Sequence, residues 1–373
     1  MPESGQKGLI EGRIGAIDAL RGFDMFWIIG GGEVFSSLDK IFTSPATAFI
    51  SRQLEHVKWE GFRFEDLIFP LFLFIVGLVM PFSISRRLER GQSRSELCLH
   101  VFKRAFLLIL TGLILNGLLR FDWPNMRWPG VLQRIGLCYF FAALVVLHTR
   151  WRTQAIVVVV VLLLYWAAMA FIPVPDYGPG VMTPEGCLSS YIDRHLLPGK
   201  IYEEYYGFGD NEGIISTFPA VCTTLLGALT GYWLRSTYSG NRKCIAMAAA
   251  GLLSLIAGYA WGTCFPVIKN IWTSSYVLVA AGYSLLLLAL FYWLIDVKGY
   301  RRWALFFIVI GVNPITIYAL QWVVDFERVA GFFVKGLADC SGAADLLILA
   351  LGALMIKWLF LLFLYRRKII IKI

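Results

Sequence analysis

An uncharged run of apolar residues, from Leu67 to Phe82, constrains the fold of this chain more than any other feature. With its aromatic lead-in from Phe62, the run approaches the roughly 20 residues that a helix needs to cross a hydrocarbon layer of about 30 Å. Composition agrees along the whole chain, since 58% of the 373 residues are hydrophobic and only 16% are charged. An average soluble domain has about 25% charged residues. The sequence therefore predicts an all-α, polytopic membrane protein.

Similar apolar segments recur along the chain and predict about ten transmembrane helices. We place them at residues 14–35, 62–83, 98–119, 130–149, 154–172, 214–236, 243–262, 273–295, 303–324 and 343–365. Basic connections such as RRLERGQSRSE alternate with outer connections that are rich in acidic and aromatic residues. Because basic loops remain in the cytoplasm, we expect both termini there. The net charge of +9 is thus a topology signal, and we expect no nucleic-acid partner.

We expect residues 1–373 to form a single transmembrane domain with a long outer loop at 173–213. The loop is rich in Pro, Gly, Tyr and acidic residues, and its length favours a lid or binding role over a passive connection. Asp210 and Glu212 lie near its end, just before a predicted helix. They would either cap that helix or face a ligand, and the residues alone leave both roles open.

The first predicted helix carries Asp18, Arg21 and Asp24 at a spacing that puts all three on one face. A charge at membrane depth costs at least about 2.5 kcal/mol, so these groups must face protein or water. We favour a structural Asp–Arg lock over direct catalysis.

The segment before the Leu67–Phe82 run, HVKWEGFRFED, places His56, Trp59 and Asp66 at the mouth of a membrane helix. Tryptophans and charged flanks are also common at an ordinary membrane boundary. The residues alone are compatible with an enzyme that uses an outward-facing histidine, a transporter that uses buried charges, or a structural subunit of an export complex. The four histidines divide between the two sides and the seven cysteines are scattered singly, so we predict no metal site.

Six segments resemble, in order and spacing, the heparan-α-glucosaminide N-acetyltransferase family. They are AIDALRG, HVKWEGFRFEDLIFPLFLFIVG, RWPGVLQRIGLCYF, GDNEGIIST, FPVIKNIWTSSYV and GVNPITIY, and they extend from residue 16 to 318. The resemblance implies a multi-pass protein of the bacterial cytoplasmic (inner) membrane that is surrounded by lipid and forms a homodimer. It also implies that cytoplasmic acetyl-CoA acetylates an amino sugar, or the end of a sugar polymer, on the outer face. Glu60 replaces an Asn of the family, which leaves the acceptor open.

By this resemblance His56 matches the active-site histidine of the family. A neutral imidazole can take a proton from an attacking amine or can itself attack the thioester, and the sequence leaves both mechanisms open. Asp66 would orient the imidazole and stabilise its protonated form. We expect Glu65 to point elsewhere on the helix.

The matching segments also supply candidate groups for binding the acetyl-CoA donor. The phosphates of CoA need cationic or polar partners, and the candidates are Arg134, Lys269 and Asn270, with Trp272 and Asn313 as lining. We favour this acetyltransferase over the alternative, an amino-sugar transporter or permease without acetyl transfer.

Overall fold

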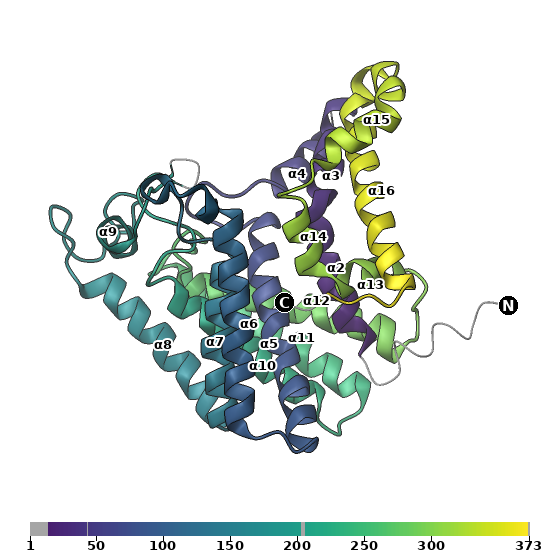
Figure 1. The fold of residues 1–373 in the computed structure, drawn as a ribbon. Coiled ribbons are helices and arrows are strands. Elements are labelled where there is room, and N and C mark those ends of the chain that lie inside the picture. Colours follow the sequence, from purple (N-terminus) through teal and green to yellow (C-terminus); the bar gives the residue numbers. More distant parts are fainter. Residues whose placement is uncertain (1–13, 43, 203–205, 372–373) are drawn as a thin grey trace.

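The computed structural model describes residues 14–42, 44–202 and 206–371, and it is built from helices (Figure 1). Strand pairing within these ranges is limited to isolated bridges between loops. The all-α prediction is therefore confirmed. The predicted N-terminal cytoplasmic segment, residues 1–13, lies outside the described residues.

In the described part of the chain, seven helices are long and apolar enough to cross a membrane. They are α5 (Glu65–Glu89), α6 (Arg94–Leu115), α7 (Val131–His148), α8 (Trp151–Phe171), α11 (Gly240–Gly262), α12 (Ser274–Tyr292), which continues into η4 (Trp293–Val297), and α16 (Asp345–Arg366). Each of them overlaps one of the predicted spans. The prediction of a polytopic membrane protein is confirmed.

The first predicted span, 14–35, is longer and less regular than expected. It comprises α2 (Gly15–Phe26), a π-helical turn η1 (Trp27–Gly31) and α3 (Gly32–Ile41). Gly30 within the turn has a φ of 133°, a conformation that a glycine adopts without steric cost. The span therefore bends at a glycine, which hydrophobicity alone does not reveal.

The predicted span at 303–324 is broken in the structure into α13 (Ala304–Val312) and α14 (Pro314–Leu320). Asn313 between them has a φ of −128° and a ψ of 54°, outside the helical region. A residue that precedes a proline is sterically pushed away from the helical conformation, and Pro314 follows directly. The local Asn313–Pro314 sequence therefore accounts for the break in the helix.

Helix α5, which follows the loop that carries His56, packs against α10 (Thr217–Leu234) through glycines. A Cβ atom at Gly77 would lie only 1.7 Å from the carbonyl oxygen of Thr224, and one at Gly227 would lie 2.0 Å from that of Phe74. Small residues let two membrane helices approach until their backbones touch. This contact holds α5, and with it Asp66, at a fixed position in the bundle.

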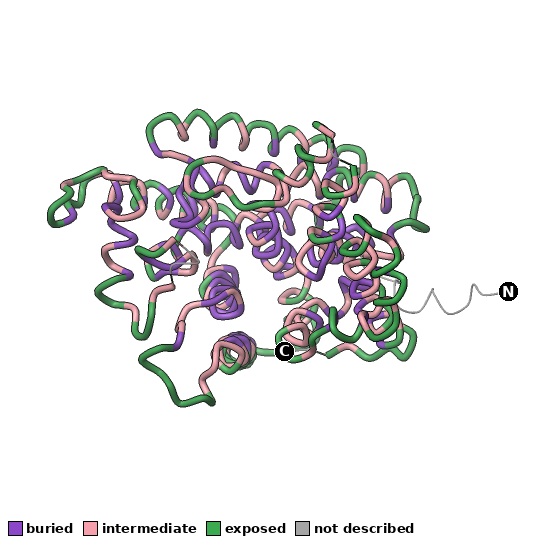
Figure 2. The backbone as a smooth tube through the Cα atoms, turned by 90° about the horizontal axis from the view of Figure 1, so that it is seen from above, coloured by how far each residue is buried: buried purple, intermediate pink, exposed green. Residues whose placement is uncertain are grey.

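Buried residues gather between the helices, and the outward faces of the outer helices are exposed (Figure 2). These outward faces carry large apolar side chains, among them Phe106, Leu163, Leu253 and Phe363. A soluble monomer rarely exposes contiguous apolar surface of this kind, whereas lipid covers it in a membrane. The burial pattern thus agrees with the hydropathy of the sequence.

The loops at 54–64, 116–130 and 263–273 meet the 173–213 loop at one end of the bundle, uppermost in Figure 1. Isolated bridges join Glu60 to Ile268 and Arg127 to Gly199 across these loops. The 173–213 loop is not structureless, since it contains α9 (Leu188–Leu196). The remaining short elements are α4 (Pro45–Gln53), η2 (Leu118–Arg120), η3 (Trp123–Asn125), α15 (Phe326–Asp339) and η5 (Gly342–Ala344).

The number of spans and the cytoplasmic location of both termini remain predictions, and cysteine accessibility tests them. In a background in which the exposed Cys264 and Cys340 are serine, we expect Gln92→Cys to react with an impermeant maleimide only after cells are opened. Pro179→Cys, in the 173–213 loop, should react in intact cells, because that loop is predicted to be outside. Labelling of position 92 from outside would reverse the orientation.

Candidate active site

Asp66, the second residue of α5, is the centre around which the preceding loop folds. Its side chain is fully buried, and its Oδ1 lies 3.1 Å from Nδ1 of His56. Its Oδ2 accepts hydrogen bonds from the backbone N–H groups of Val57, at 3.3 Å, and Arg63, at 3.1 Å. One carboxylate therefore closes the loop and positions the imidazole. The predicted pairing of His56 with Asp66 is present in the structure.

Lys269, from the loop between α11 and α12, completes this cluster. Its Nζ lies 2.9 Å from Nδ1 and 3.2 Å from Nε2 of His56, and 3.5 Å from Oδ1 of Asp66. Burial lowers the pKa of Lys269, while the negative charges of Asp66, Glu65 and Glu212 act in the opposite direction. The structure thus places a partly desolvated ammonium against the imidazole.

The contact with Asp66 favours one tautomer of His56. An ionised carboxylate only accepts hydrogen bonds, so a proton on Nδ1 would point to Asp66. Nε2 then keeps its lone pair. The Lys269 ammonium lies 2.9 Å from Nδ1 and 3.2 Å from Nε2, so it contacts the ring beside both nitrogens. The His56 side chain is 56% exposed, so a ligand can reach Nε2. The arrangement is that of a general base or a nucleophile held by a carboxylate.

Glu65, the first residue of α5, is half-buried. The charges of His56, Lys269 and Asp66 act on its carboxylate. The expectation that its side chain points elsewhere on the helix stays a prediction.

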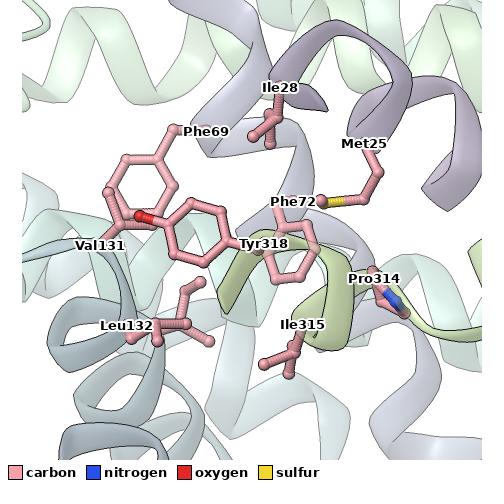
Figure 3. A pocket seen from close by; sticks show the side chains of 10 residues that line it. Met25, Ile28, Phe69, Phe72, Val131, Leu132, Pro314, Ile315 and Tyr318 are labelled. Atoms are coloured by element: carbon pink, nitrogen blue, oxygen red, sulfur yellow. The ribbon is translucent and has the colours of Figure 1, made fainter. Parts of the chain in front are cut away.

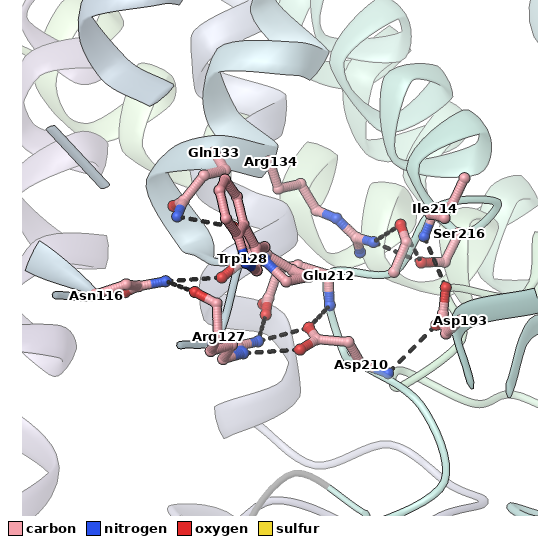
Figure 4. A network of polar contacts seen from close by, with 12 residues as sticks. Asn116, Arg127, Trp128, Gln133, Arg134, Asp193, Asp210, Glu212, Ile214 and Ser216 are labelled. Carbon is pink, nitrogen blue, oxygen red and sulfur yellow. Dashed lines mark hydrogen bonds and ion pairs between the residues drawn. The ribbon is translucent and has the colours of Figure 1, made fainter. Parts of the chain in front are cut away.

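A second ion-pair cluster joins the outer loops beside the first (Figure 4). Arg127 donates through Nε to Oδ2 of Asp210, at 2.8 Å, and through Nη2 to Oδ1 of Asp210, at 2.6 Å, and to Oε2 of Glu212. The helix cap considered for the two acids is not formed, because Ser216 is the N-cap residue of α10 and no side-chain cap hydrogen bond is present. Arg127 was not among the predicted site residues, although it lies in the RWPG segment that resembles the family.

Arg134, on the first turns of α7, is 1% exposed and only partly satisfied. Its Nη2 donates to the carbonyl oxygen of Gly213, at 3.1 Å, and to Oγ of Ser216, and its guanidinium lies 5.1 Å from the centre of the Trp272 ring. Its Nε and Nη1 have no hydrogen-bond partner in residues 14–42, 44–202 and 206–371. Buried polar groups are normally hydrogen-bonded, so these two nitrogens point to a polar or anionic ligand.

The other predicted site residues have separate locations. Trp59 donates from Nε1 to the carbonyl oxygen of Met182, at 2.7 Å, and so ties the His56 loop to the 173–213 loop. Asn270 donates to the carbonyl oxygen of Lys58, at 3.2 Å, on the same face. Asn313 is not brought to the cluster, because its amide pairs with the C-terminal backbone at Ile369 and Ile371.

The predicted lock on the first helix is present in part. Arg21 pairs with Asp18, at 3.3 Å, and also reaches the carbonyl oxygen of Gly311 on α13, at 3.4 Å. These contacts tie α2 to α13. Asp24 takes no part in them, although it is fully buried.

No three His, Cys, Asp or Glu side chains come together as a possible metal site within the described ranges.

Comparison with known proteins identifies the family. Residues 13–262 match the model of the heparan-alpha-glucosaminide N-acetyltransferase catalytic domain. The chain belongs to this family. The match contains His56 and Asp66, the Arg127 cluster and Arg134, and ends just before the Lys269 loop.

Two relatives in the heparan-alpha-glucosaminide N-acetyltransferase family are similar over most of this chain. The human heparan-alpha-glucosaminide N-acetyltransferase is 27% identical over 97% of the chain, and the mouse protein of the same name is 27% identical over 86%. This chain spans 60% of the length of the human relative and 56% of that of the mouse relative.

Asp193 on α9 supports the loop that carries Asp210 and Glu212. Its Oδ1 accepts from the backbone N–H of Ile214, at 2.9 Å, and its Oδ2 from that of Asp210, at 3.3 Å (Figure 4). Burial raises the pKa of Asp193 to about 6. Between roughly pH 4 and pH 6 the folded protein keeps a proton that the unfolded chain has already lost. This contribution to stability is therefore largest at acid pH and is lost as the pH rises through 6.

We expect Asp193→Asn, which removes the ionisation, to gain in melting temperature relative to the unmodified protein as the pH rises from 5 to 7. The change in the difference between pH 5 and pH 7 corresponds to a free energy of about 1.3 kcal/mol. Melting curves in detergent measure it. The exposed Asp176 serves as the control, since Asp176→Asn should show a difference that is the same at both pH values. A pH-independent difference for Asp193→Asn would contradict the assignment.

Proposed function

We propose that this chain is a transmembrane acetyltransferase that moves an acetyl group from cytoplasmic acetyl-CoA to the amine of a glucosamine-type sugar on the outer face. One observation carries the proposal. His56, Asp66 and Lys269 form a connected cluster at the mouth of a membrane helix, in a chain that belongs to an N-acetyltransferase family.

His56 is the base of the proposed reaction. Its Nε2 takes a proton from the acceptor amine while the nitrogen bonds to the acetyl carbon. The carbon–sulfur bond of the thioester breaks, and the proton passes from His56 to the leaving thiolate. Asp66 keeps the imidazole in the required tautomer and stabilises its charged form. The ammonium of Lys269 is placed to stabilise negative charge on the acetyl oxygen.

An apolar cavity supports a route for the donor (Figure 3). It is small, about 20 Å³, and lies between α2, η1, α5, α7 and α14, and Met25, Phe69, Val131, Ile315 and Tyr318 are among its lining residues. Phe69 lies three residues after Asp66, so the cavity begins about one helical turn from the cluster. We propose that the arm of CoA that carries the thioester enters here, and that the lining side chains move apart to admit it.

The same geometry refines the proposed role of the basic residues. Lys269 contacts His56. Trp272 lies three residues after Lys269 on the same loop, and the guanidinium of Arg134 lies against its ring. We therefore propose that both contact the acetyl end of the donor rather than its phosphates. Asn270 and Trp272 frame this end, and Asn313 remains a candidate for a more distant part of CoA.

The wider setting of the activity is also a proposal. Residues 1–373 act as one transmembrane domain of a bacterial cytoplasmic membrane, with both termini in the cytoplasm. Homodimerisation stays a prediction, and native mass spectrometry in mild detergent tests it. Vesicles loaded with labelled acetyl-CoA separate the enzyme from a permease, because the enzyme releases labelled acetyl-sugar outside without moving the sugar inward.

We expect His56→Ala to lower acetylation of glucosamine by a factor of about 10²–10⁴, because a proton-transfer group typically supplies this much. The variant should still bind acetyl-CoA. The measurement is turnover by purified protein, with a melting curve for each variant.

Asp66→Asn should lower turnover less than His56→Ala does, because a misoriented imidazole still has a basic nitrogen. Glu55→Gln, an exposed carboxylate one residue before His56, is the matched control and should retain turnover. Unchanged turnover in His56→Ala would refute the assignment.

We expect Arg134→Ala and Lys269→Ala to weaken acetyl-CoA binding more than glucosamine binding. A charge-assisted contact contributes about 1.5–3 kcal/mol, so the affinity should fall roughly 10- to 150-fold. Isothermal titration with acetyl-CoA measures the change, and Lys200→Ala on the exposed part of the outer loop is the control. Arg134→Lys preserves the charge if the alanine variant folds poorly. If neither residue affects donor affinity, the donor must bind elsewhere.

A further inference from the structure

The apolar cavity proposed for the donor arm is closed in this structure. Its volume of about 20 Å³ leaves room for little more than one water molecule. The arm of CoA that carries the thioester is much larger than a water molecule, so it fits only after a wall of the cavity has moved. The walls are α2 with η1, α5, α7 and α14, and they differ in how firmly they are held.

Three of the walls are held by close backbone contacts at glycines. Helix α5 touches α10 at Gly77, and a Cβ atom at Gly22 on α2 would lie only 1.7 Å from the carbonyl oxygen of Phe307 on α13. On α7, a Cβ atom at Gly136 would lie 3.0 Å from the carbonyl oxygen of Ala105 on α6. Helices packed this closely lose the contact when they separate. We therefore treat α2, α5 and α7 as the fixed walls.

The remaining wall, α14, is short and weakly held. Within α14, all of which the structure describes, Ile317 alone is buried. The helix is separated from α13 by the non-helical Asn313 and from α15 by residues 321–325. Such breaks at both ends are where a chain absorbs the backbone changes of a hinge motion. Helix α14 supplies three of the side chains that line the cavity, namely Pro314, Ile315 and Tyr318 (Figure 3).

The segment that follows α16 is bound to the hinge at Asn313. The side-chain amide of Asn313 donates to the carbonyl oxygen of Ile369, at 3.0 Å, and its Oδ1 accepts from the backbone N–H of Ile371, at 2.9 Å. Asn313 is 1% exposed, whereas the side chains of the two isoleucines are exposed. Figure 1 shows this segment, in yellow, running back from the end of α16 towards the middle of the bundle. One buried side chain thus holds an otherwise exposed segment.

The direction of this segment is set at the end of α16. Lys368 has a φ of 58°, a left-handed conformation that residues other than glycine rarely adopt. The N–H of Ile369 donates to the carbonyl oxygen of Leu364, at 2.9 Å, and that of Lys368 to the carbonyl oxygen of Tyr365, at 3.0 Å. These are the two hydrogen bonds of a Schellman turn. The turn sends the chain back to Asn313, so the contact is built into the end of the helix.

We propose that α14 is the gate of the donor cavity and that residues 369–371 are the latch that keeps this gate closed. The inference rests on the proposed acetyl transfer and adds a regulatory step at the same site. When the two hydrogen bonds to Asn313 break, the backbone at the hinge is free to rotate, and α14 moves Ile315 and Tyr318 out of the cavity. The latched form excludes acetyl-CoA, so the apparent affinity is reduced by the fraction of molecules that are unlatched.

Ile371→Pro tests the latch, because proline has no N–H to donate to Asn313. Isothermal titration should give a Kd for acetyl-CoA that is about 2- to 12-fold lower than in the unmodified protein, since the latched form loses one neutral hydrogen bond. Asn313→Ala, which removes both hydrogen bonds, should lower the Kd at least as much. Ile371→Ala keeps the N–H and is the matched control, and its Kd should equal that of the unmodified protein.

A second measurement needs neither acetyl-CoA nor turnover. Ile315→Cys, in the background in which the exposed Cys264 and Cys340 are serine, reports on the gate by its rate of reaction with a maleimide. Adding Ile371→Pro should speed this reaction by about the same factor, because position 315 leaves the cavity when α14 moves. Adding Ile371→Ala should leave the rate unchanged.

The outcomes separate the gate from the acetyltransferase. If the unmodified protein transfers acetyl groups and Ile371→Pro changes neither the Kd nor the maleimide rate, the gate is refuted and the acetyltransferase stands. If Ile371→Pro speeds the maleimide reaction but acetyl-CoA does not bind, the gate stands and the proposed donor is wrong. A faster maleimide reaction with an unchanged Kd refutes control of donor binding by α14. Weaker binding in Asn313→Ala with unchanged binding in Ile371→Pro would make Asn313 a direct contact of CoA and refute the latch.

Discussion

The buried carboxylate of Asp66 is the group on which the outer end of the molecule depends. It accepts from two backbone N–H groups of the preceding loop and contacts His56 and Lys269. A carboxylate removed from water is stable only when hydrogen bonds and an opposite charge replace its hydration. The loop therefore cannot close without the contacts that orient the imidazole. Structural stability and chemical geometry here come from one set of contacts.

The rigidity of that set comes from deeper in the bundle. Asp66 begins a helix whose glycines let it touch α10 backbone to backbone, and Tyr276 on α12 donates to the carbonyl oxygen of Asp66, at 2.7 Å. The loop that precedes α10 is held by Asp193 and Arg127. Sites on packed helices hold their geometry better than sites on loops alone. Although His56 itself lies on a loop, three helices fix the groups around it.

The sequence revealed the features that depend on composition and local order. Apolar runs predicted the spans, and the position of His56 and Asp66 at one helix mouth predicted that they meet. Features that depend on distant contacts were not legible. Lys269 reaches His56 across 213 positions, and Arg127 reaches Asp210 across 83.

The arrangement of charge suits the donor side of the proposed reaction. Lys269 lies against His56, and Arg134 keeps two nitrogens without a partner within residues 14–42, 44–202 and 206–371. Such groups would stabilise a thioester oxygen that gains negative charge. Opposite charges at short range are strong only where water is scarce. The mouth of a membrane helix offers that condition, so the position of His56 follows from the proposed reaction as well as from the fold.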